Sequence, residues 1–129
     1  MDIKVGDFIR TKKGIIGKLK RIELDEIDKN LKWYVFDKKR PDMNIIDEIY
    51  INKPYITKYS KNLIDLIEVR DIVEYQVNFL SELKVGRVKS YRNARSNKEY
   101  LGVEGFDITK IYIKSILTHE QYNANCHSI

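Results

Sequence analysis

Short stretches in which apolar and polar residues alternate run along most of this chain, and they constrain its fold more than any other feature. These stretches are rich in β-branched and aromatic residues, which is typical of strands. They cover residues 5–12, 15–22, 32–37, 69–80, 84–91, 100–106 and 111–117, with 45–51 either a strand or a short helix. No long stretch has the 3.6-residue apolar period of a helix. The sequence therefore predicts a mainly β fold with short helices, either a small, strongly bent antiparallel sheet or a small barrel.

Turn and capping residues separate these stretches. Gly14 follows Lys13 at a predicted hairpin turn, and Gly17 is expected at a bulge or a point of close approach. Ser60 is a capping residue before one or two predicted helical turns in 60–67. Thr118 and the residue three positions later form a capping box, which predicts a short helix over 119–123 and then a terminal strand over 126–129.

A weak internal echo links two distant parts of the chain. Residues 3–9, Ile-Lys-Val-Gly-Asp-Phe-Ile, resemble residues 67–73, Ile-Glu-Val-Arg-Asp-Ile-Val, with Ile, Val and Asp in register. The echo predicts two similar β-hairpin units, 3–23 and 67–91, unless the shared strand pattern arose by chance. Because 129 residues supply material for one hydrophobic core, a single domain over 1–129 is expected.

The balance of charged residues favours anionic partners. The chain has 24 Lys and Arg residues against 19 Asp and Glu residues, a net charge of +5, which suits nucleic acid, nucleotides or an acidic protein face. No apolar run approaches the roughly 20 residues that span a bilayer, and Met1 leads directly into a predicted strand. Cys126 is the only cysteine, so no intrachain disulfide can form. A cytoplasmic protein with no membrane partner is expected.

The first of two basic clusters lies in the opening hairpin. No acidic residue occurs between Arg10 and Arg21 in the sequence, and four cations of this stretch are candidate contacts for nucleic acid or another anion: Arg10, Lys12, Lys18 and Lys20. Lys18 and Lys20 are two residues apart and are expected on one face of their strand.

The second basic cluster combines arginines with tyrosines. Its candidate ligand-binding residues are Arg87, Tyr91, Arg92, Arg95 and Tyr100. The planar guanidinium of arginine suits phosphate, and a tyrosine ring offers a stacking surface for a base. These residues predict a site for a nucleotide-like anionic small molecule. The alternative interpretation is a solvated, flexible hairpin tip.

The sequence supports neither a catalytic site nor a metal site. Cys126, His127 and His119 are the only Cys and His residues, whereas a structural zinc site usually needs four such ligands. The carboxylate pairs, such as Asp25 with Asp28, lie in charged stretches typical of a solvated face. No phosphate-binding glycine loop or acyl-transfer triad is present. A protein that is not an enzyme and has no metal or cofactor is expected.

Two resemblances narrow these expectations. The Val-Gly-Asp-Phe-Ile opening with its Lys-Gly turn resembles the first hairpin of SH3-like barrels, so the predicted barrel is SH3-like. Residues 5–12, 60–71 (Ser-Lys-Asn-Leu-Ile-Asp-Leu-Ile-Glu-Val-Arg-Asp) and 116–122 (Ile-Leu-Thr-His-Glu-Gln-Tyr) are similar, in the same order, to small phage and prophage proteins of Firmicutes. The chain departs from that pattern at Arg70, where glycine is expected, and in a longer stretch from 84 to 107.

The phage resemblance implies an accessory protein that counters a host defence system by binding. Sequestration of a nucleotide-derived immune signal is one form of this function. Direct inhibition of a defence protein, through loops such as 24–31, and nucleic-acid binding through the opening hairpin are the alternatives. The nine tyrosines also suit a protein interface, and a homo-oligomer is expected.

Overall fold

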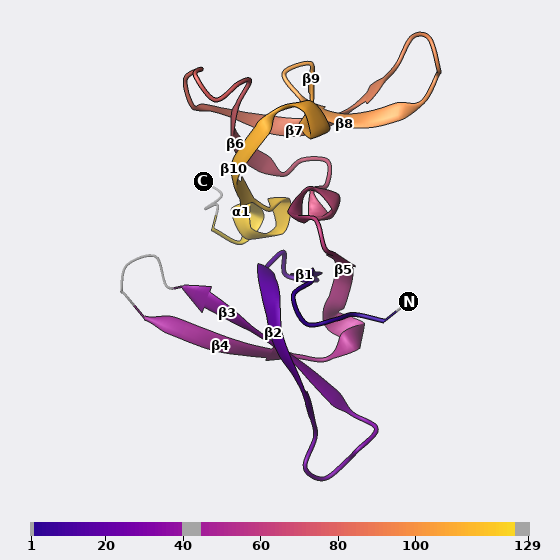
Figure 1. Ribbon diagram of the computed structural model, residues 1–129, viewed down its shortest axis with the longest axis vertical. Helices are drawn as coiled ribbons and strands as arrows, with labels where there is room; N and C mark the ends of the chain where they lie inside the picture. The colour runs from indigo at the N-terminus through magenta and orange to yellow at the C-terminus, as the bar shows by residue number, and fades with distance from the viewer. Residues whose placement is uncertain (1, 40–44, 126–129) are drawn as a thin grey trace. The chain divides into compact units, whose positions relative to one another are not determined.

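The computed structural model describes residues 2–39 and 45–125 and confirms the prediction of a mainly β fold (Figure 1). Contacts within the chain cluster in two compact units, Met1–Leu66 (unit 1) and Ile67–Ile129 (unit 2). Each unit contains one five-stranded antiparallel sheet. Within the described residues neither sheet closes into a barrel. No helix in this part of the chain is long and apolar enough to cross a membrane.

Unit 1 forms its sheet from the first five strands in the order β4-β3-β2-β1-β5. The strands are β1 (Phe8–Thr11), β2 (Ile16–Leu24), β3 (Lys32–Lys39), β4 (Ile46–Ile51) and β5 (Ile56–Ser60). A 3-10 segment, η1 (Lys53–Tyr55), precedes β5, and a second, η2 (Leu63–Leu66), follows it. Residues 46–51 are thus a strand, and the helical turns predicted in 60–67 are the 3-10 segment η2.

Unit 2 forms its sheet in the order β10-β6-β7-β8-β9. The strands are β6 (Ile72–Gln76), β7 (Lys84–Arg92), β8 (Glu99–Val103), β9 (Phe106–Asp107) and β10 (Tyr112–Leu117). The 3-10 segment η3 (Ile108–Lys110) precedes β10, and the helix α1 (His119–Asn125) follows it, where the capping box predicts a helix. The terminal strand predicted over 126–129 lies outside the described residues.

The two units have the same arrangement of strands. In each unit the first strand pairs with both the second and the fifth, and a 3-10 segment comes directly before the fifth strand. The pairing of the first and fifth strands also contains an irregularity in both units, between Arg10 and Thr11 in β1 and between Ile113 and Ser115 in β10. Unit 2 therefore repeats the element order of unit 1.

The internal echo at 3–9 and 67–73 falls on the turn that opens each unit. In unit 1 the carboxylate of Asp7 accepts a hydrogen bond from the Lys4 amide at 3.0 Å, and in unit 2 Asp71 accepts one from the Glu68 amide at 2.8 Å. The residue before each aspartate donates its amide to the second strand, Gly6 to the carbonyl of Leu19 and Arg70 to the carbonyl of Val88, both at 2.9 Å. The two turns thus make the same hydrogen bonds at matching positions.

Arg70 occupies a backbone conformation that favours glycine. Its φ is 81°, close to the 95° of Gly6 at the matching position, and a turn of this kind ordinarily places glycine there. The tight turn is nevertheless present in unit 2: the Asp71 amide donates a hydrogen bond to the Glu68 carbonyl at 3.1 Å. The chain therefore retains the turn with a strained arginine.

We expect Arg70→Gly to raise the free energy of unfolding by about 0.5–1 kcal/mol, because relief of positive-φ strain outweighs the larger backbone entropy of glycine. The matched change Gly6→Arg should lower it by about 1–2 kcal/mol, since it introduces the same strain in unit 1. Chemical denaturation of the three proteins measures both changes. Destabilisation by Arg70→Gly would contradict this reading of the turn.

Each unit buries apolar residues of its first three strands in a core. One cluster of buried residues in unit 1 consists of Ile3, Ile9, Leu19, Tyr34 and Phe36. Unit 2 buries Val73, Tyr75, Val88, Val103 and Ile108. A glycine in the second strand of each unit lies against this core, and an added Cβ would be too close to the Phe36 ring at Gly17 and to the Val103 side chain at Gly86.

Candidate ligand-binding site

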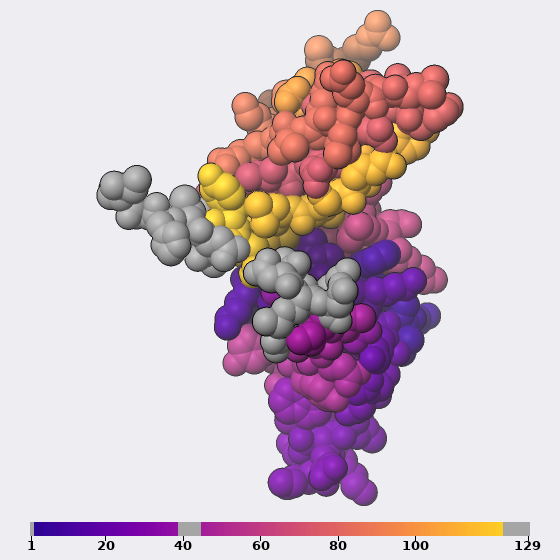
Figure 2. Space-filling view, turned by 90° about the vertical axis from the view of Figure 1, so that its left-hand side faces the viewer, coloured from indigo at the N-terminus to yellow at the C-terminus, as the bar shows by residue number. Residues whose placement is uncertain are grey.

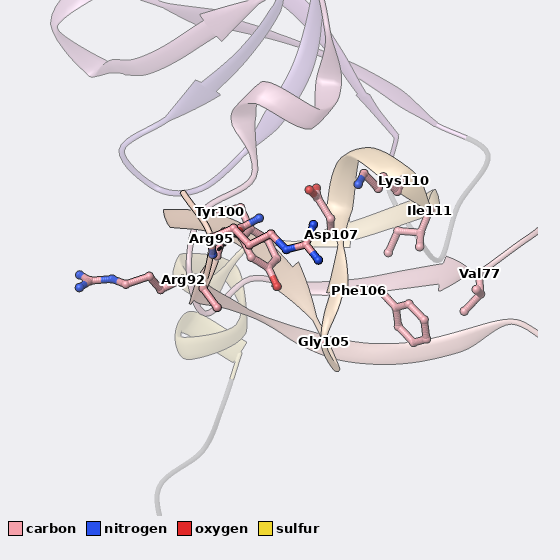
Figure 3. Close-up of a pocket in the computed structure, with 11 residues that line it drawn as sticks. Val77, Arg92, Arg95, Tyr100, Gly105, Phe106, Asp107, Lys110 and Ile111 are labelled. Carbon is pink, nitrogen blue, oxygen red and sulfur yellow. Dashed lines mark hydrogen bonds between the residues drawn. The ribbon is translucent and has the colours of Figure 1, made fainter. Parts of the chain in front are cut away.

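Unit 2 contains an open cavity of about 680 Å³ at the end of its sheet where β7 and β8 meet (Figure 3). The residues that line it come from the loop after β7, from β8 and β9, from η3 and from the end of β6. They include Val77, Arg92, Arg95, Tyr100, Phe106, Asp107, Lys110 and Ile111. A volume of this size lies within the range of small-molecule sites.

The loop that carries Arg92 and Arg95 is held by hydrogen bonds of its own backbone and side chains. The Asn93 side-chain oxygen accepts from the Arg95 amide at 2.9 Å and from the Ser96 amide at 3.3 Å. The Asn97 amide donates to the Asn93 carbonyl at 2.8 Å, and Asn97 has a φ of 56°, which asparagine tolerates better than most residues. The stretch interpreted as either a site or a solvated tip is thus a hydrogen-bonded turn at the cavity edge.

Three cations and one carboxylate line the cavity. Asp107 accepts hydrogen bonds from the Thr109 hydroxyl at 2.7 Å and the Thr109 amide at 2.9 Å, and these bonds hold the pKa of Asp107 below its usual range. Figure 3 shows Arg95 reaching toward the other lining residues, whereas Arg92 extends away from them. Arg92 lies 3.4 Å from Glu99, but Arg95 has no ion pair with a carboxylate in the described part of the chain. The cavity is therefore cationic, with Arg95 and Lys110 as its charged donors.

Tyr100 provides the aromatic surface of the site. Its ring stacks on the Tyr91 ring, with the centroids 5.6 Å apart and the planes at 22°. Tyr91 is fixed in turn, because its hydroxyl accepts a hydrogen bond from the Gly105 amide at 3.1 Å and its ring packs against Gly102, where a Cβ would come within 2.9 Å. Tyr91 thus holds the ring of Tyr100 in place.

The structure brings together most of the second basic cluster. Arg92, Arg95 and Tyr100 line the cavity, and Tyr91 supports it. Arg87 lies elsewhere, with its guanidinium 5.4 Å from the centroid of the Tyr122 ring. The sequence interpretation missed the lining residues from β9 and η3, namely Phe106, Asp107 and Lys110. These residues reach the site only because the chain returns to it through β9 and η3. A local sequence pattern could not have shown this.

The first basic cluster does not form one exposed cationic stripe. Arg10 is fully buried and donates to the Leu66 carbonyl at 2.9 Å, so it is not available to a ligand at the surface. Lys20 forms ion pairs with carboxylates of β3 and β4, and these bonds raise its pKa. Lys12 lies 5.5 Å from the Tyr55 ring centroid, and Lys18 lies over Phe8 in the same way at 5.8 Å.

Glu48 offsets positive charge of this hairpin. Its carboxylate accepts hydrogen bonds from Arg21 at 2.6 and 3.1 Å and also pairs with Lys20. The Arg21 and then the Lys20 hydrogen bonds lower the pKa of Glu48 to about 2. The cluster therefore stabilises the fold above the ordinary glutamate pKa, and this contribution is lost as the pH falls toward 2. Arg21 also pairs with Glu23 of its own strand, whereas Glu48 and Asp37 come from the two following strands.

One group in the described part of the chain has the composition of a metal site. Potential ligand atoms of Glu68, His119 and Glu120 lie within 4.8 Å of one another. The His119 Nε2 atom is already 3.3 Å from Glu68 and 3.1 Å from Glu120, which is the geometry of a histidine between two carboxylates. The remaining Cys and His residues of the chain, Cys126 and His127, for which the sequence supports no metal site, lie outside the described residues.

Comparison with models of protein families, with curated proteins and with solved structures finds no match.

Proposed function

We propose that the protein binds a nucleotide-like anionic small molecule in the cavity of unit 2 and does not transform it. The observation that carries this proposal is the position of Arg95 and Lys110 beside the stacked ring of Tyr100 around one cavity. Arginine and lysine donate charge-assisted hydrogen bonds to phosphate oxygens, and a free face of a tyrosine ring can stack with a base. Arg95 and Lys110 can thus bind the phosphate group of a nucleotide while the neighbouring Tyr100 ring stacks with its base.

The lining supports binding better than catalysis. Its one carboxylate, Asp107, is occupied in capping η3 through Thr109, and a general base needs a free proton acceptor within reach of its substrate. The cations and the aromatic ring, by contrast, are suited to holding a charged, planar ligand. The proposed role is therefore sequestration.

The setting proposed for this role follows from the sequence resemblance to phage and prophage proteins. In the cytoplasm of an infected or lysogenic bacterium, a non-enzymatic protein that captures a nucleotide-derived immune signal would prevent that signal from reaching its effector. Capture requires affinity and a sufficient number of sites, and it requires no turnover.

The proposal predicts that Arg95→Ala weakens nucleotide binding at least about tenfold, because it removes a charge-assisted hydrogen bond worth about 1.5–3 kcal/mol. Isothermal titration calorimetry with AMP, ATP and cyclic di-AMP measures the affinity. Lys89→Ala is a matched control, since Lys89 is an exposed cation of β7 that does not line the cavity. Its affinity should equal that of the wild type.

Two results would overturn the proposal. One is the absence of binding to all three nucleotides by the folded wild-type protein. The other is equal weakening by Arg95→Ala and Lys89→Ala, which would show that only the net charge of the protein matters. Because Arg95 is exposed, both variants should retain the wild-type thermal transition.

A second candidate function, direct inhibition of a host protein, is favoured by the tip of the β2–β3 hairpin. Figure 2 shows this tip, in purple, protruding from its unit. Ile27 at the tip is 96% exposed, and the Asp25 carboxylate fixes the turn by accepting hydrogen bonds from the Ile27 and Asp28 amides and the Trp33 indole. An ordered acidic loop with an exposed apolar side chain suits a protein partner. Co-purification of one host protein that is lost on Ile27→Asp would support this function.

A further inference from the structure

The loop between β6 and β7 presents large apolar side chains to solvent. Phe79 is 73% exposed, Leu80 84% and Leu83 52%. The apolar surface continues onto the sheet, where Val85 and Tyr112 are also exposed. Val85 pairs with Glu74 of β6, and Tyr112 pairs with Gln76 of the same strand. Glu74 and Gln76 are two residues apart and so share a face of the sheet. The side chains of Val85 and Tyr112 therefore lie on that same face. We name Phe79, Leu80 and Leu83 the apolar tip.

Hydrogen bonds hold the apolar tip in one conformation. The Ser81 amide and hydroxyl both donate to the Asn78 carbonyl, at 3.0 and 2.8 Å. The Asn78 side chain accepts from the Leu80 amide at 3.0 Å, and the Gln76 side chain donates to the Ser81 carbonyl at 2.8 Å. An ordered loop loses little conformational entropy on binding. The tip therefore has the preorganisation of a docking element.

Unit 1 contains an apolar pocket of about 270 Å³. Its floor is formed by Ile15, Ile49 and Ile51, which pack on the core of that unit. Tyr55 forms one wall, and Lys12 and Lys13 lie at the rim. Like the ligand cavity of unit 2, the pocket is lined in part by the fourth strand of its unit and by the 3-10 segment before the fifth strand, but its lining is apolar. It suits a large hydrophobic side chain next to a negative charge.

We propose that the protein self-associates by inserting the apolar tip of one copy into the unit 1 pocket of another. The phenyl group of Phe79 fits a pocket of this volume, and the exposed carboxylate of Glu82, three residues later, complements the lysines at the rim. Glu82 has no ion-pair partner in the described part of the chain. The contact buries apolar surface on both sides, which is the main source of binding free energy. This inference is independent of the ligand proposed for unit 2.

Light scattering with size-exclusion chromatography over a concentration series tests the contact. The wild type should exceed the monomer mass and dissociate on dilution. Phe79→Ser combined with Leu80→Ser should raise the dissociation constant at least about tenfold, because exposed aromatic anchors of this kind dominate association. Both side chains are exposed, so the fold and its thermal transition should be unchanged.

A charge exchange identifies the two surfaces. Lys12→Glu and Glu82→Lys should each weaken association, since each places like charges in the contact. An equimolar mixture of the two variants should associate as the wild type does, because every mixed contact then has opposite charges. A wild type that stays monomeric at all concentrations, a tip variant with unchanged association, or a mixture that is not restored would each overturn the proposal.

Discussion

Gly17→Val should lower the free energy of unfolding by about 3 kcal/mol, because the new side chain has no room in the core of unit 1. A Cβ at this position would lie 2.8 Å from Cγ and 2.9 Å from Cε2 of Phe36. The Phe36 ring is fully buried in the unit 1 cluster, so it can move only by displacing its neighbours. This loss is a large fraction of the 5–15 kcal/mol that stabilises a typical domain. Urea denaturation followed by Trp33 fluorescence measures it.

A double-mutant cycle shows whether the ring causes the loss. In a Phe36→Leu background the aromatic ring is absent, so Gly17→Val should cost at least about 1 kcal/mol less than it does in the wild type. Equal costs in the two backgrounds would show that the contact with Phe36 is not responsible. Gly86→Val should behave similarly in unit 2, where Val103 takes the place of Phe36.

Asp71→Ala is expected to lower the free energy of unfolding by about 2–4 kcal/mol. The Asp71 carboxylate is fully buried and accepts hydrogen bonds from the Glu68 amide at 2.8 Å and the His119 amide at 2.9 Å. It thereby connects the opening turn of unit 2 to the first residue of α1. The substitution removes an acceptor from both amides, and an unsatisfied buried donor costs about 1–3 kcal/mol. Thermal denaturation and amide hydrogen exchange at Glu68 and His119 measure the effect.

Unit 1 supplies the matched control for Asp71. Asp7 has the same place in its turn, but the structure shows its carboxylate accepting from one backbone amide, that of Lys4 at 3.0 Å. Asp7→Ala should therefore cost about half as much as Asp71→Ala, near 1–2 kcal/mol. Asp71→Asn, which keeps one acceptor oxygen, should fall between Asp71→Ala and the wild type. An Asp71→Ala protein as stable as the wild type would contradict the role assigned to this carboxylate.

The strands of this chain could be predicted from the sequence because each is a local pattern. Alternation over 84–91 and 111–117 matches β7 and β10 to within one residue, and the capping box at Thr118 marks the start of α1. The assignment of strands to two sheets could not be predicted in this way, because it depends on pairing between distant strands. The Ile-Val-Asp echo was the one signal of that arrangement, and it coincides with the matching turns at Asp7 and Asp71.

The candidate site could be predicted only where its residues are close in sequence. Arg92, Arg95 and Tyr100 lie in or beside one hairpin loop, and all three line the cavity. Lys110 comes from η3, and nothing in its local sequence links it to that loop. Charge compensation has the same limitation: Lys20 stands in a run of cations in the sequence, but strand pairing brings Glu48 to it. Local patterns identify elements and short loops, whereas burial and ion pairing follow from tertiary contacts.

A ligand that the protein carries out of the cell would identify what the cavity of unit 2 binds. The wild type and Arg95→Ala are expressed in bacteria with an active nucleotide-signalling defence, purified, and denatured by heat, and the supernatants are analysed by ultraviolet absorbance and mass spectrometry. The proposed function predicts that the wild type releases a nucleotide and that Arg95→Ala releases little or none. A folded wild-type protein that releases no nucleotide, or equal release from both proteins, would contradict it.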